Sequence, residues 1–575
     1  MKYIKSILVI SLFNAGFLMA QEPTIHNEQV LVVGGYEPTL KDAVKIEINP
    51  SLIDTGIIKY PVQYRISSRK LTTEFVPEKL KPARIVGEPI SLLYRNYLKL
   101  GVGSHLMPYA EYYHSNTRSK NAQYGVYVNH LSSWLSIPEY DNTSYANTEV
   151  QIFGRRLLNN AVLSGDVFYK NDYYHYYGRG TVLGDSVGNP FHSDPHTIHR
   201  LGFNARYQSA YSNTEKLHHS AGLHLQNMMG MGKLNELNVK VDANLHKKLS
   251  FFYGEKQTLG LNFSWEHFAD RRDSVNLPTG YRHLAGEGLR KGNASIFDVN
   301  PYVLLNIYGL HFNAGVHAFA GVEEDSTTWV LSPEVALHHT FFKDILFLKA
   351  GISGSFERAG LDKMLRENPY LSPLSASGFV KNPFNLFGRV ELAMEKHLDL
   401  NAEFAYSVFK NAPLFGIDSS FRCQNVYMPI YDDYEQFKIG GELVYEIENK
   451  FRVGAAYYYY SYSTSNEAEA WYKPSFELRL NGKYRIADKF IFGLTTSFLG
   501  KMHQYTWQLN SDGTLSKELG KIENRMDINL SAEYRYSKRL SFFLLLNNIA
   551  NQQYFVWTNY PTQRMNALVG LTFSF

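Results

Sequence analysis

From about residue 93 onward, hydrophobic and polar residues alternate along the chain in stretches of roughly ten, and a turn signal follows each stretch. In 237–246, the odd positions hold Leu, Val, Val, Ala and Leu, and the even positions hold Asn, Lys, Asp, Asn and His. The stretches 476–484 and 528–536 alternate in the same way. Successive side chains of a strand point to opposite faces, so each stretch predicts a strand with one apolar and one polar face.

About 22 stretches of this kind follow one another, and an even number is typical of single-chain outer-membrane barrels. A soluble β-sandwich also alternates, but its strands are shorter and rarely carry so many aromatic residues on the apolar face. The stretches begin near Tyr97, Ala110, Tyr124, Val150, Val162, Gly202, Ala221, Leu237, Leu259, Ile296, Leu310, Val330, Leu346, Leu386, Leu400, Phe437, Phe451, Phe476, Phe490, Ile528, Phe542 and Ala567. The pattern therefore predicts an all-β fold, a transmembrane antiparallel β-barrel of about 22 strands.

The connections between these stretches alternate between short and long, which gives an independent check on the count. Short connections follow even stretches, at 158–160, 306–309, 395–397, 448–450, 487–489 and 537–539. Long connections follow odd stretches, at about 171–199, 270–294, 359–384, 411–435, 461–474, 501–525 and 551–565. With a periplasmic N-terminus, the short turns lie on the periplasmic side and the long loops outside, as in known outer-membrane barrels.

Composition supports a membrane wall that is built from strands. The 575 residues include 42 Tyr, 36 Phe and 42 Gly, and aromatic residues make up 15% of the chain. Mean hydropathy is −0.29, and no apolar run of about 20 residues follows the N-terminal segment, which excludes transmembrane helices. The net charge of +4 argues against a dedicated nucleic-acid binder, so no nucleic-acid partner is expected.

Residues 1–20 have the pattern of a secretory signal peptide, because Lys2 and Lys5 precede an apolar run that starts at 7–13 and Ala20 precedes the expected cleavage site. Residues 21–92 contain widely spaced prolines, which predicts an extended periplasmic segment and leaves no room for a complete plug domain. Residues 93–575 form the predicted barrel. An exported chain whose only cysteine is Cys423 has no internal disulfide, and we expect it in the cell outer membrane.

The predicted loop 171–199 carries the densest group of candidate binding residues. Aromatic and imidazole side chains follow one another at Tyr173, Tyr174, His175, Tyr176 and Tyr177, and we expect them to contact a ligand. Further metal-ligating residue types follow at His192, Asp194, His196 and His199. Such spacing suits a transition metal, but nothing in it defines a tetrahedral geometry, and a Tyr/His girdle with a solvated loop is the favoured interpretation. No metal, cofactor or catalytic group is predicted, because zinc-spaced cysteines and phosphate-binding glycine loops are missing from the sequence.

The C-terminal part of the chain resembles TonB-dependent receptors. The stretch 546–554, LNNIANQQY, is similar to their NLFN-x-x-Y element, and Tyr560, Pro561 and Arg564 follow in the family's order. The resemblance implies the family's barrel of about 22 strands. The last strand ends with Phe573 and Phe575, an end that the barrel-assembly machinery commonly reads.

A second resemblance lies near the N-terminus. The VVVVGY TonB box of some receptors is similar to Val30, Leu31, Val32, Val33, Gly34, Gly35 and Tyr36. This resemblance implies ligand or nutrient uptake across the outer membrane, with TonB pairing to the box by strand addition. The expected partners are TonB, the assembly machinery, outer-membrane lipid and lipopolysaccharide, and a protein that fills the lumen or binds the surface. Two alternatives stay open: an ungated or partner-plugged pore, and a non-transporting structural subunit of an outer-membrane complex.

Overall fold

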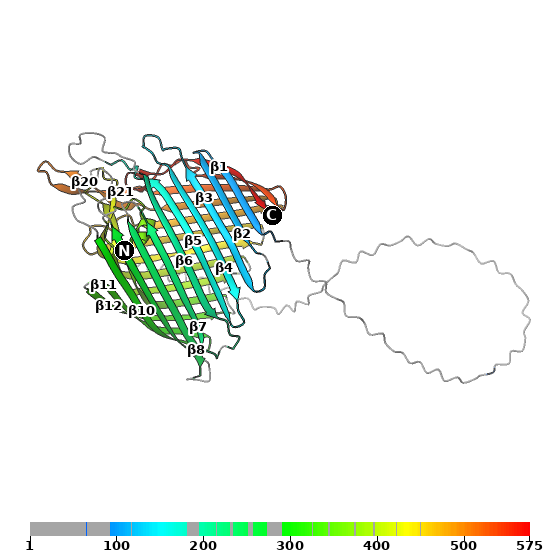
Figure 1. Ribbon diagram of the computed structural model, residues 1–575. Coiled ribbons are helices and arrows are strands. Elements are labelled where there is room, and N and C mark those ends of the chain that lie inside the picture. Colours follow the sequence, from blue (N-terminus) through cyan, green and yellow to red (C-terminus); the bar gives the residue numbers. More distant parts are fainter. Residues whose placement is uncertain are drawn as a thin grey trace, which may run out of the picture. The chain divides into compact units, whose positions relative to one another are not determined.

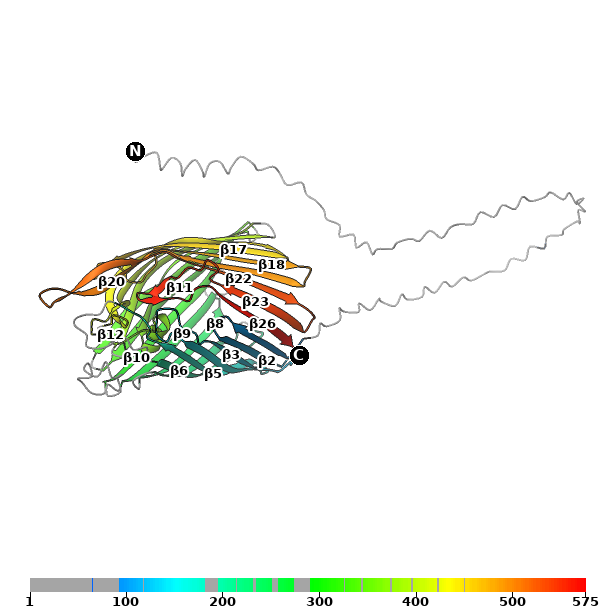
Figure 2. The same cartoon turned by 90° about the horizontal axis from the view of Figure 1, so that it is seen from above.

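A continuous antiparallel sheet of 22 strands closes on itself to form a barrel (Figures 1 and 2). In the computed structural model the first strand, β1 (Asn96–Gly103), pairs with the last strand, β26 (Asn566–Ser574), from Tyr97↔Ser574 to Gly103↔Leu568. The other side of β26 pairs with β23 (Leu540–Asn547). This closure satisfies main-chain groups that an open sheet would expose to lipid.

All the elements below belong to one compact unit, Pro89–Phe575. The structure describes residues 65, 93–116, 118–180, 195–213, 215–230, 234–250, 257–272, 290–324, 326–342, 345–372, 375–394, 397–420, 423–448 and 450–575. The predicted signal peptide and the TonB-box-like residues 30–36 lie outside the described residues.

The barrel strands follow one another around the ring in the order of the sequence. Between β1 and β23 they are β2 (Met107–Ser115), β3 (Ala122–Ser133), β4 (Tyr145–Leu157), β5 (Ala161–His175), β6 (Pro195–Ser209), β7 (His218–Met229), β8 (Asn235–Leu249), β9 (Gln257–Arg272), β10 (Arg290–Ile307), β11 (Leu310–Glu323), β12 (Ser326–Phe341), β13 (Leu346–Ala359), β14 (Gly378–Met394), β15 (Leu398–Ile417), β16 (Tyr427–Ile447), β17 (Phe451–Thr464), β18 (Phe476–Ile486), β19 (Phe490–Leu499) and β22 (Arg525–Arg535).

The predicted fold is confirmed, since every predicted stretch begins inside a barrel strand and the order is the same. Two small hairpins stand outside the barrel sheet: β20 (Met502–Leu509) with β21 (Leu515–Ile522), and β24 (Phe555–Trp557) with β25 (Tyr560–Pro561). A short helix, α2 (Leu361–Glu367), lies between β13 and β14. No helix in the described ranges is both long and apolar enough to cross a bilayer.

Some strands are longer than the alternation predicts. The predicted loop 411–435 contains the ends of β15 and β16, which pair as far as Ile417↔Tyr427 after a register shift between Phe409 and Ala412. Most residues of 412–417 are buried, and apolar residues follow one another there because both faces of the strand pack against protein. The alternation of apolar and polar residues therefore disappears where the hairpin leaves the lipid-facing wall.

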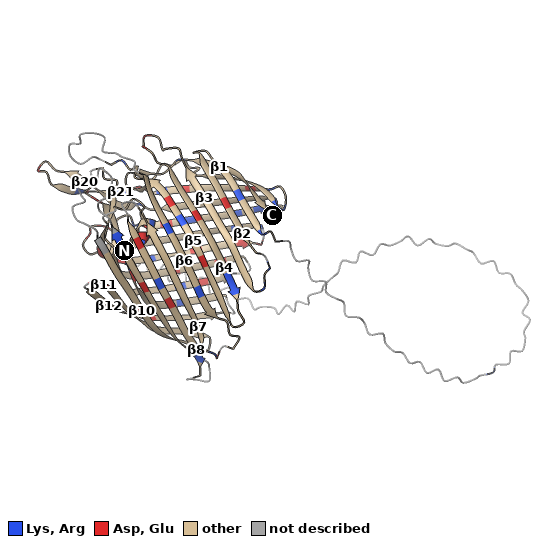
Figure 3. Ribbon diagram, in the orientation of Figure 1, with Lys and Arg blue, Asp and Glu red and all other residues tan. Residues whose placement is uncertain are grey.

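Charged residues are distributed along the barrel strands, with uncharged residues between them (Figure 3). Apolar side chains such as Leu237 and Leu245 are exposed at alternate positions, where a membrane barrel meets lipid. The charged positions between them face the lumen and compensate each other. Ion pairs between strands include Lys170–Glu149 at 2.8 Å, Lys240–Glu266 at 3.4 Å, Arg206–Asp242 at 3.2 Å and His317–Asp298 at 3.0 Å.

An epitope tag inserted after Asp512 should be labelled by antibody on intact cells. Asp512 lies at the exposed tip of the β20–β21 hairpin, in a predicted external connection, and a side chain added at Gly513 would meet no atom within 4 Å. Tags after Asn159 or Asp488, in short turns, should be labelled only after the outer membrane is permeabilised. Labelling of these two tags on intact cells would reverse the orientation. A tag within 412–417 is unsuitable, because that segment is a buried strand.

Candidate functional site

Side chains from the outer connections pack into one hydrophobic cluster, which we call the cap. Its members come from strands that are close to half of the ring apart, such as β6 and β16, so the cap lies across the outer mouth of the barrel. The hairpin β20–β21 and the segment β24–β25 also contribute to it. The buried residues of the cap are Ile198, Met228, Leu234, Ala359, Leu361, Met364, Leu365, Leu371, Val380, Ala412, Leu414, Phe415, Ile417, Tyr427, Tyr434, Trp471, Tyr472, Met502, Tyr505, Ile522, Trp557 and Tyr560.

Helix α2 is the part of the cap that is most strongly tied to the wall. The carboxylate of Glu236, on β8, accepts hydrogen bonds from the backbone N–H groups of Leu361 (2.5 Å) and Asp362 (3.3 Å). Asp362 forms a buried ion pair with Arg200 of β6 and a second ion pair of 2.7 Å with Arg366. Leu361 points into the cap and is fully buried. These contacts hold the cap against β6 and β8.

Asp362 is charged in the closed cap. Burial alone would raise the pKa of this carboxyl group, but the cations of Arg200 and Arg366 outweigh it and lower the pKa below its usual range. A buried carboxylate needs such partners, because desolvation otherwise favours its neutral form. At the other end of α2, Lys473 in the β17–β18 connection pairs with Glu367 at 3.1 Å. The helix therefore links nearly opposite sides of the ring.

The predicted tyrosine group lies largely inside the cap. Tyr174 donates to the carbonyl of Pro369 at 2.6 Å, Tyr176 to that of Leu371 at 2.8 Å, and Tyr177 to that of Pro561 at 2.9 Å. Burial raises the pKa of Tyr177 to about 12, so its hydroxyl stays a neutral donor. In the closed structure these three hydroxyls therefore join the wall strand β5 to other cap segments.

The two remaining members of this group lie beside the tyrosine cluster. The Tyr173 hydroxyl is 3.4 Å from Nε2 of His175, whose Nδ1 is 2.9 Å from the carbonyl oxygen of Ser144. Their ligand-binding role is still a prediction, as it is for Tyr174, Tyr176 and Tyr177.

The histidines of the predicted metal group are separated. His196 is buried between the rings of Tyr174 and Tyr176, at centroid distances of 4.9 and 5.4 Å, whereas His199 lies within 2.9 Å of Tyr169 and Asn171. His192 and Asp194 lie outside the described residues. Within the described ranges, no three His, Cys, Asp or Glu side chains gather into a metal site.

Sequence reasoning missed the half of the cap that comes from the later loops. Tyr427 donates to the carbonyl of Thr558 at 2.7 Å, and the hydroxyl of Tyr472 lies 2.7 Å from that of Thr558. Tyr370 stacks on Tyr560 with ring centroids 3.4 Å apart. The available signal was the aromatic content of loops 359–384, 461–474 and 551–565, but these residues meet only in the folded barrel.

A polar hollow of about 420 Å³ opens beside the cap, between the β20–β21 hairpin and the β23–β26 connection. Amide, charged and aromatic side chains line it, and such groups recognise polar ligands by directed hydrogen bonds and ring contacts. Six of them are Gln504, Lys521, Glu523, Gln552, Gln553 and Tyr554. This hollow lies on the side where an external ligand arrives.

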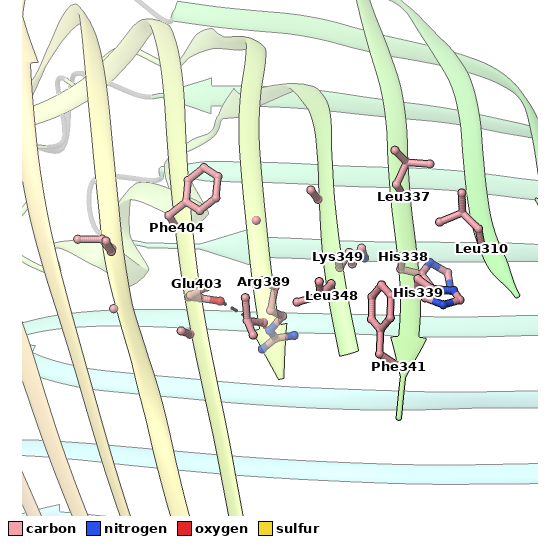
Figure 4. Close-up of a pocket in the computed structure, with 16 residues that line it drawn as sticks. Leu310, Leu337, His338, His339, Phe341, Leu348, Lys349, Arg389, Glu403 and Phe404 are labelled. Atoms are coloured by element: carbon pink, nitrogen blue, oxygen red, sulfur yellow. Dashed lines mark ion pairs between the residues drawn. The ribbon is translucent and has the colours of Figure 1, made fainter. Parts of the chain in front are cut away.

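A second hollow of about 500 Å³ lies on the wall itself (Figure 4). The small residues Ala350, Gly388 and Ala402 form its lining together with exposed apolar side chains such as Leu337 and Phe404. This apolar surface belongs to the lipid-facing side, so the hollow is not where a polar ligand would be captured.

A closed barrel with an apolar outer face, a charged lumen and short turns at one end defines an integral outer-membrane protein. No protein-family model matches the chain, and no curated protein matches it in sequence.

Solved structures identify the fold more closely. The ferripyoverdine receptor of the outer membrane of Pseudomonas aeruginosa, bound to ferripyoverdine, has a TM-score of 0.62 and 14% identity over 85% of this chain and 72% of the receptor. The ferric-catecholate import receptor Fiu of E. coli K12 has a TM-score of 0.59 and 12% identity, with 84% and 82% covered. The siderophore receptor PirA of Acinetobacter baumannii has a TM-score of 0.60 and 10% identity, with 85% and 81% covered. The chain thus has the fold of TonB-dependent siderophore receptors. These neighbours are transport receptors and not enzymes.

Proposed function

We propose that the chain is an outer-membrane uptake receptor whose outer mouth is closed by its own cap. The observation that carries this proposal is the cap itself, which lies across the mouth and leaves a charged lumen below it. An ungated pore needs no buried hydrophobic cluster at its entrance, whereas a receptor needs an entrance that opens on demand. The fold similarity to siderophore receptors supports the same function.

The polar hollow beside the cap is the proposed first contact for the ligand, because its amide groups and Tyr554 are accessible while the cap is closed. Opening of the cap would release the hydroxyls of Tyr174, Tyr176 and Tyr177 from their carbonyl partners. Together with Tyr173 and His175 they would then offer hydrogen bonds to a ligand that enters the lumen. In this proposal the same side chains hold the cap closed in one state and contact the ligand in the open state.

The proposed driving partner is TonB, pairing by strand addition with residues 30–36, which lie within the proposed N-terminal segment 21–92; the part of this segment that follows the box is the tether to the barrel. Phe573 and Phe575, at the end of β26, are the proposed signal for the assembly machinery, and their rings stack at 5.4 Å. Outer-membrane lipid and lipopolysaccharide would surround the apolar wall.

Val32→Pro should abolish cross-linking of the chain to TonB, because proline has no backbone N–H and ends strand pairing. Val32→Ala retains the N–H and should keep the cross-link. Both variants should assemble into heat-modifiable barrels. Growth on the transported nutrient should fail in a deletion strain and be restored by Val32→Ala but not by Val32→Pro. A wild-type chain that shows no TonB cross-link would leave the proposal without its driving partner.

A further inference from the structure

A polar hollow of about 970 Å³ lies at the end of the barrel that carries the short turns. The β18–β19 turn, the β22–β23 turn and the adjoining ends of β26 and β1 line it. One of its lining residues is Ser574, next to the C-terminus, which Figure 2 marks at the end of the barrel away from the β20 hairpin. The hollow is therefore at the opposite end of the lumen from the cap.

The strand register shows which way the wall of this hollow faces. Arg535, Ser541 and Thr572 are paired side by side across β22, β23 and β26, and all three line the hollow. Phe542 and Phe573, which follow the two hydroxyl residues in the sequence, are exposed on the apolar outer face. Because successive side chains of a strand point to opposite faces, the arginine and the two hydroxyl residues point into the lumen and away from lipid.

Positive charge in the hollow exceeds negative charge. Its charged residues are four cations and two carboxylates, namely Lys489, Arg535, Lys538 and Arg539 with Asp488 and Glu533. Glu533 pairs with Arg535 at 3.4 Å, whereas in the described part of the chain no ion pair joins a carboxylate to Lys489, Lys538 or Arg539. Elsewhere in the lumen the cations are matched, as in the pair of Lys438 with Glu403. The hollow therefore offers cations that lack a carboxylate partner.

The same excess continues along the neighbouring strands. A smaller hollow of about 170 Å³ lies at the same end of β16, β17 and β18. Four cations and one carboxylate line it, namely Lys450, Arg452, Lys483 and Arg485 with Glu446. The positive charge therefore extends over consecutive strands of the ring from β16 to β1, and it adds to the attraction of the larger hollow for anions.

Main-chain hydrogen bonds hold the turns of the larger hollow in place. The N–H group of Arg535 donates to the carbonyl of Lys489 at 2.8 Å, and that of Ser574 donates to the carbonyl of Arg539 at 2.8 Å. The hydroxyl oxygen of Ser537 accepts the N–H group of Arg539 at 3.2 Å. The two turns are thus fixed to each other and to β26 before any ligand arrives, which lowers the entropic cost of binding.

We propose that this hollow binds a small soluble ligand that carries two or more phosphate or carboxylate groups. Lys489, Lys538 and Arg535 supply the positive charge, and charge-assisted hydrogen bonds to such oxygens are stronger than neutral ones. The hydroxyls of Ser541 and Thr572 add donors on the inner wall. The volume of the hollow is within the range of about 300–1,000 Å³ that is usual for small-molecule sites.

Phospholipid headgroups also carry phosphate, but they surround the outside of the barrel. Arg535, Ser541 and Thr572 point into the lumen, so a soluble anion reaches all three and a lipid headgroup does not. An anionic cargo that entered at the cap would meet this site last, before it leaves the lumen. That role rests on the proposed uptake function, whereas binding of the anion does not.

The test is equilibrium dialysis of the complete mature protein in detergent against radiolabelled pyrophosphate and, separately, citrate at low ionic strength. We expect saturable binding of at least one of them, with one site per barrel. Lys489→Gln with Lys538→Gln should weaken this binding about tenfold, because two charge-assisted contacts are lost. The matched control is Lys247→Gln with Lys248→Gln, which removes the same charge from the corresponding end of β8, nearly half of the ring away, and should leave binding unchanged.

A second pair of substitutions separates a defined site from diffuse attraction to a positive surface. Ser541→Ala with Thr572→Ala removes two hydroxyl donors and changes no charge, so it should weaken binding several-fold while its dependence on salt stays the same. The heat-modifiable fraction shows that each variant still forms a barrel. The turn variants at Lys489 and Lys538 are exposed and carry the test if the hydroxyl variants do not assemble.

Three results would overturn the proposal. The first is no saturable binding of either anion at millimolar concentration, and the second is equal weakening in the Lys489/Lys538 and Lys247/Lys248 variants. The third comes from native mass spectrometry of the protein with phosphatidylglycerol. A bound lipid that depends on Lys489 and Lys538 and that pyrophosphate does not displace would assign the cations to the membrane. All these measurements use the closed barrel without TonB, so a failure of the uptake proposal leaves their outcome unaffected.

Discussion

Arg200→Met is expected to convert a silent barrel into a conducting one in planar bilayers. Arg200 is buried and forms ion pairs with Asp362 of α2 and with Asp172. Removing one partner of a buried pair costs about 3–5 kcal/mol, and because Arg366 still pairs with Asp362 in this variant, the cost lies at the lower end of that range. Because 1.4 kcal/mol is tenfold in an equilibrium constant, the open cap should become more populated by a factor of about a hundred or more.

The matched control is Arg206→Met on the same strand. The Arg206 side chain is 54% exposed and pairs with Asp242 at 3.2 Å, so the pair is worth only about 0–1 kcal/mol and the barrel should stay silent. Because the pKa of Asp362 is lowered in the closed cap, the stabilisation that this carboxylate provides is present at neutral pH and is lost as the pH falls through that lowered value. Wild-type channels should therefore appear only in strong acid. If Arg200→Met conducts no more ions than the wild type, another element closes the lumen.

Val241→Arg should strongly reduce insertion of the barrel. Val241 lies near the middle of β8, opposite Leu223 on β7 and Trp265 on β9, with its side chain on the apolar face. An arginine on the lipid face at mid-depth costs about 2–4 kcal/mol, which is a large share of the stability of a domain. The heat-modifiable fraction in outer-membrane preparations measures the effect.

Leu478→Arg and Arg479→Leu give a paired comparison on β18. Leu478 is on the lipid face near the outer end of the strand, so its arginine variant should show a smaller loss than Val241→Arg. Arg479 is on the lumen face and pairs with Glu477 at 2.5 Å in an exposed position, so Arg479→Leu should leave insertion nearly unchanged. Similar losses from Leu478→Arg and Arg479→Leu would mean that the assignment of the two faces is wrong.

The number of strands, their order and the face on which each side chain lies could be predicted, because these features depend on residues that are close together in the sequence. A period of two over about ten residues, as in 237–246, needs no knowledge of distant residues, and short turns such as 487–489 set the alternation of inside and outside. Val241 and Lys240 were assigned to opposite faces from this pattern alone, and the ion pair of Lys240 with Glu266 agrees with it.

The cap and the short pairing between β12 and β13 were decided only by the tertiary structure. Arg200 and Asp362 are 162 residues apart, and no local pattern pairs a strand arginine with a helix carboxylate. The segment 412–417 does not alternate between apolar and polar residues, because protein covers both of its faces. A prediction based on periodicity therefore assigns this segment to a loop. β12 and β13 pair only from Val335↔Ile352 to Phe341↔Leu346. The outer half of β13 packs against the inner wall instead, where Phe356 meets a partner on β11 and Arg358 a partner on β9. Strand periodicity is a local property, whereas loop burial and strand partner choice are set by contacts across the whole ring.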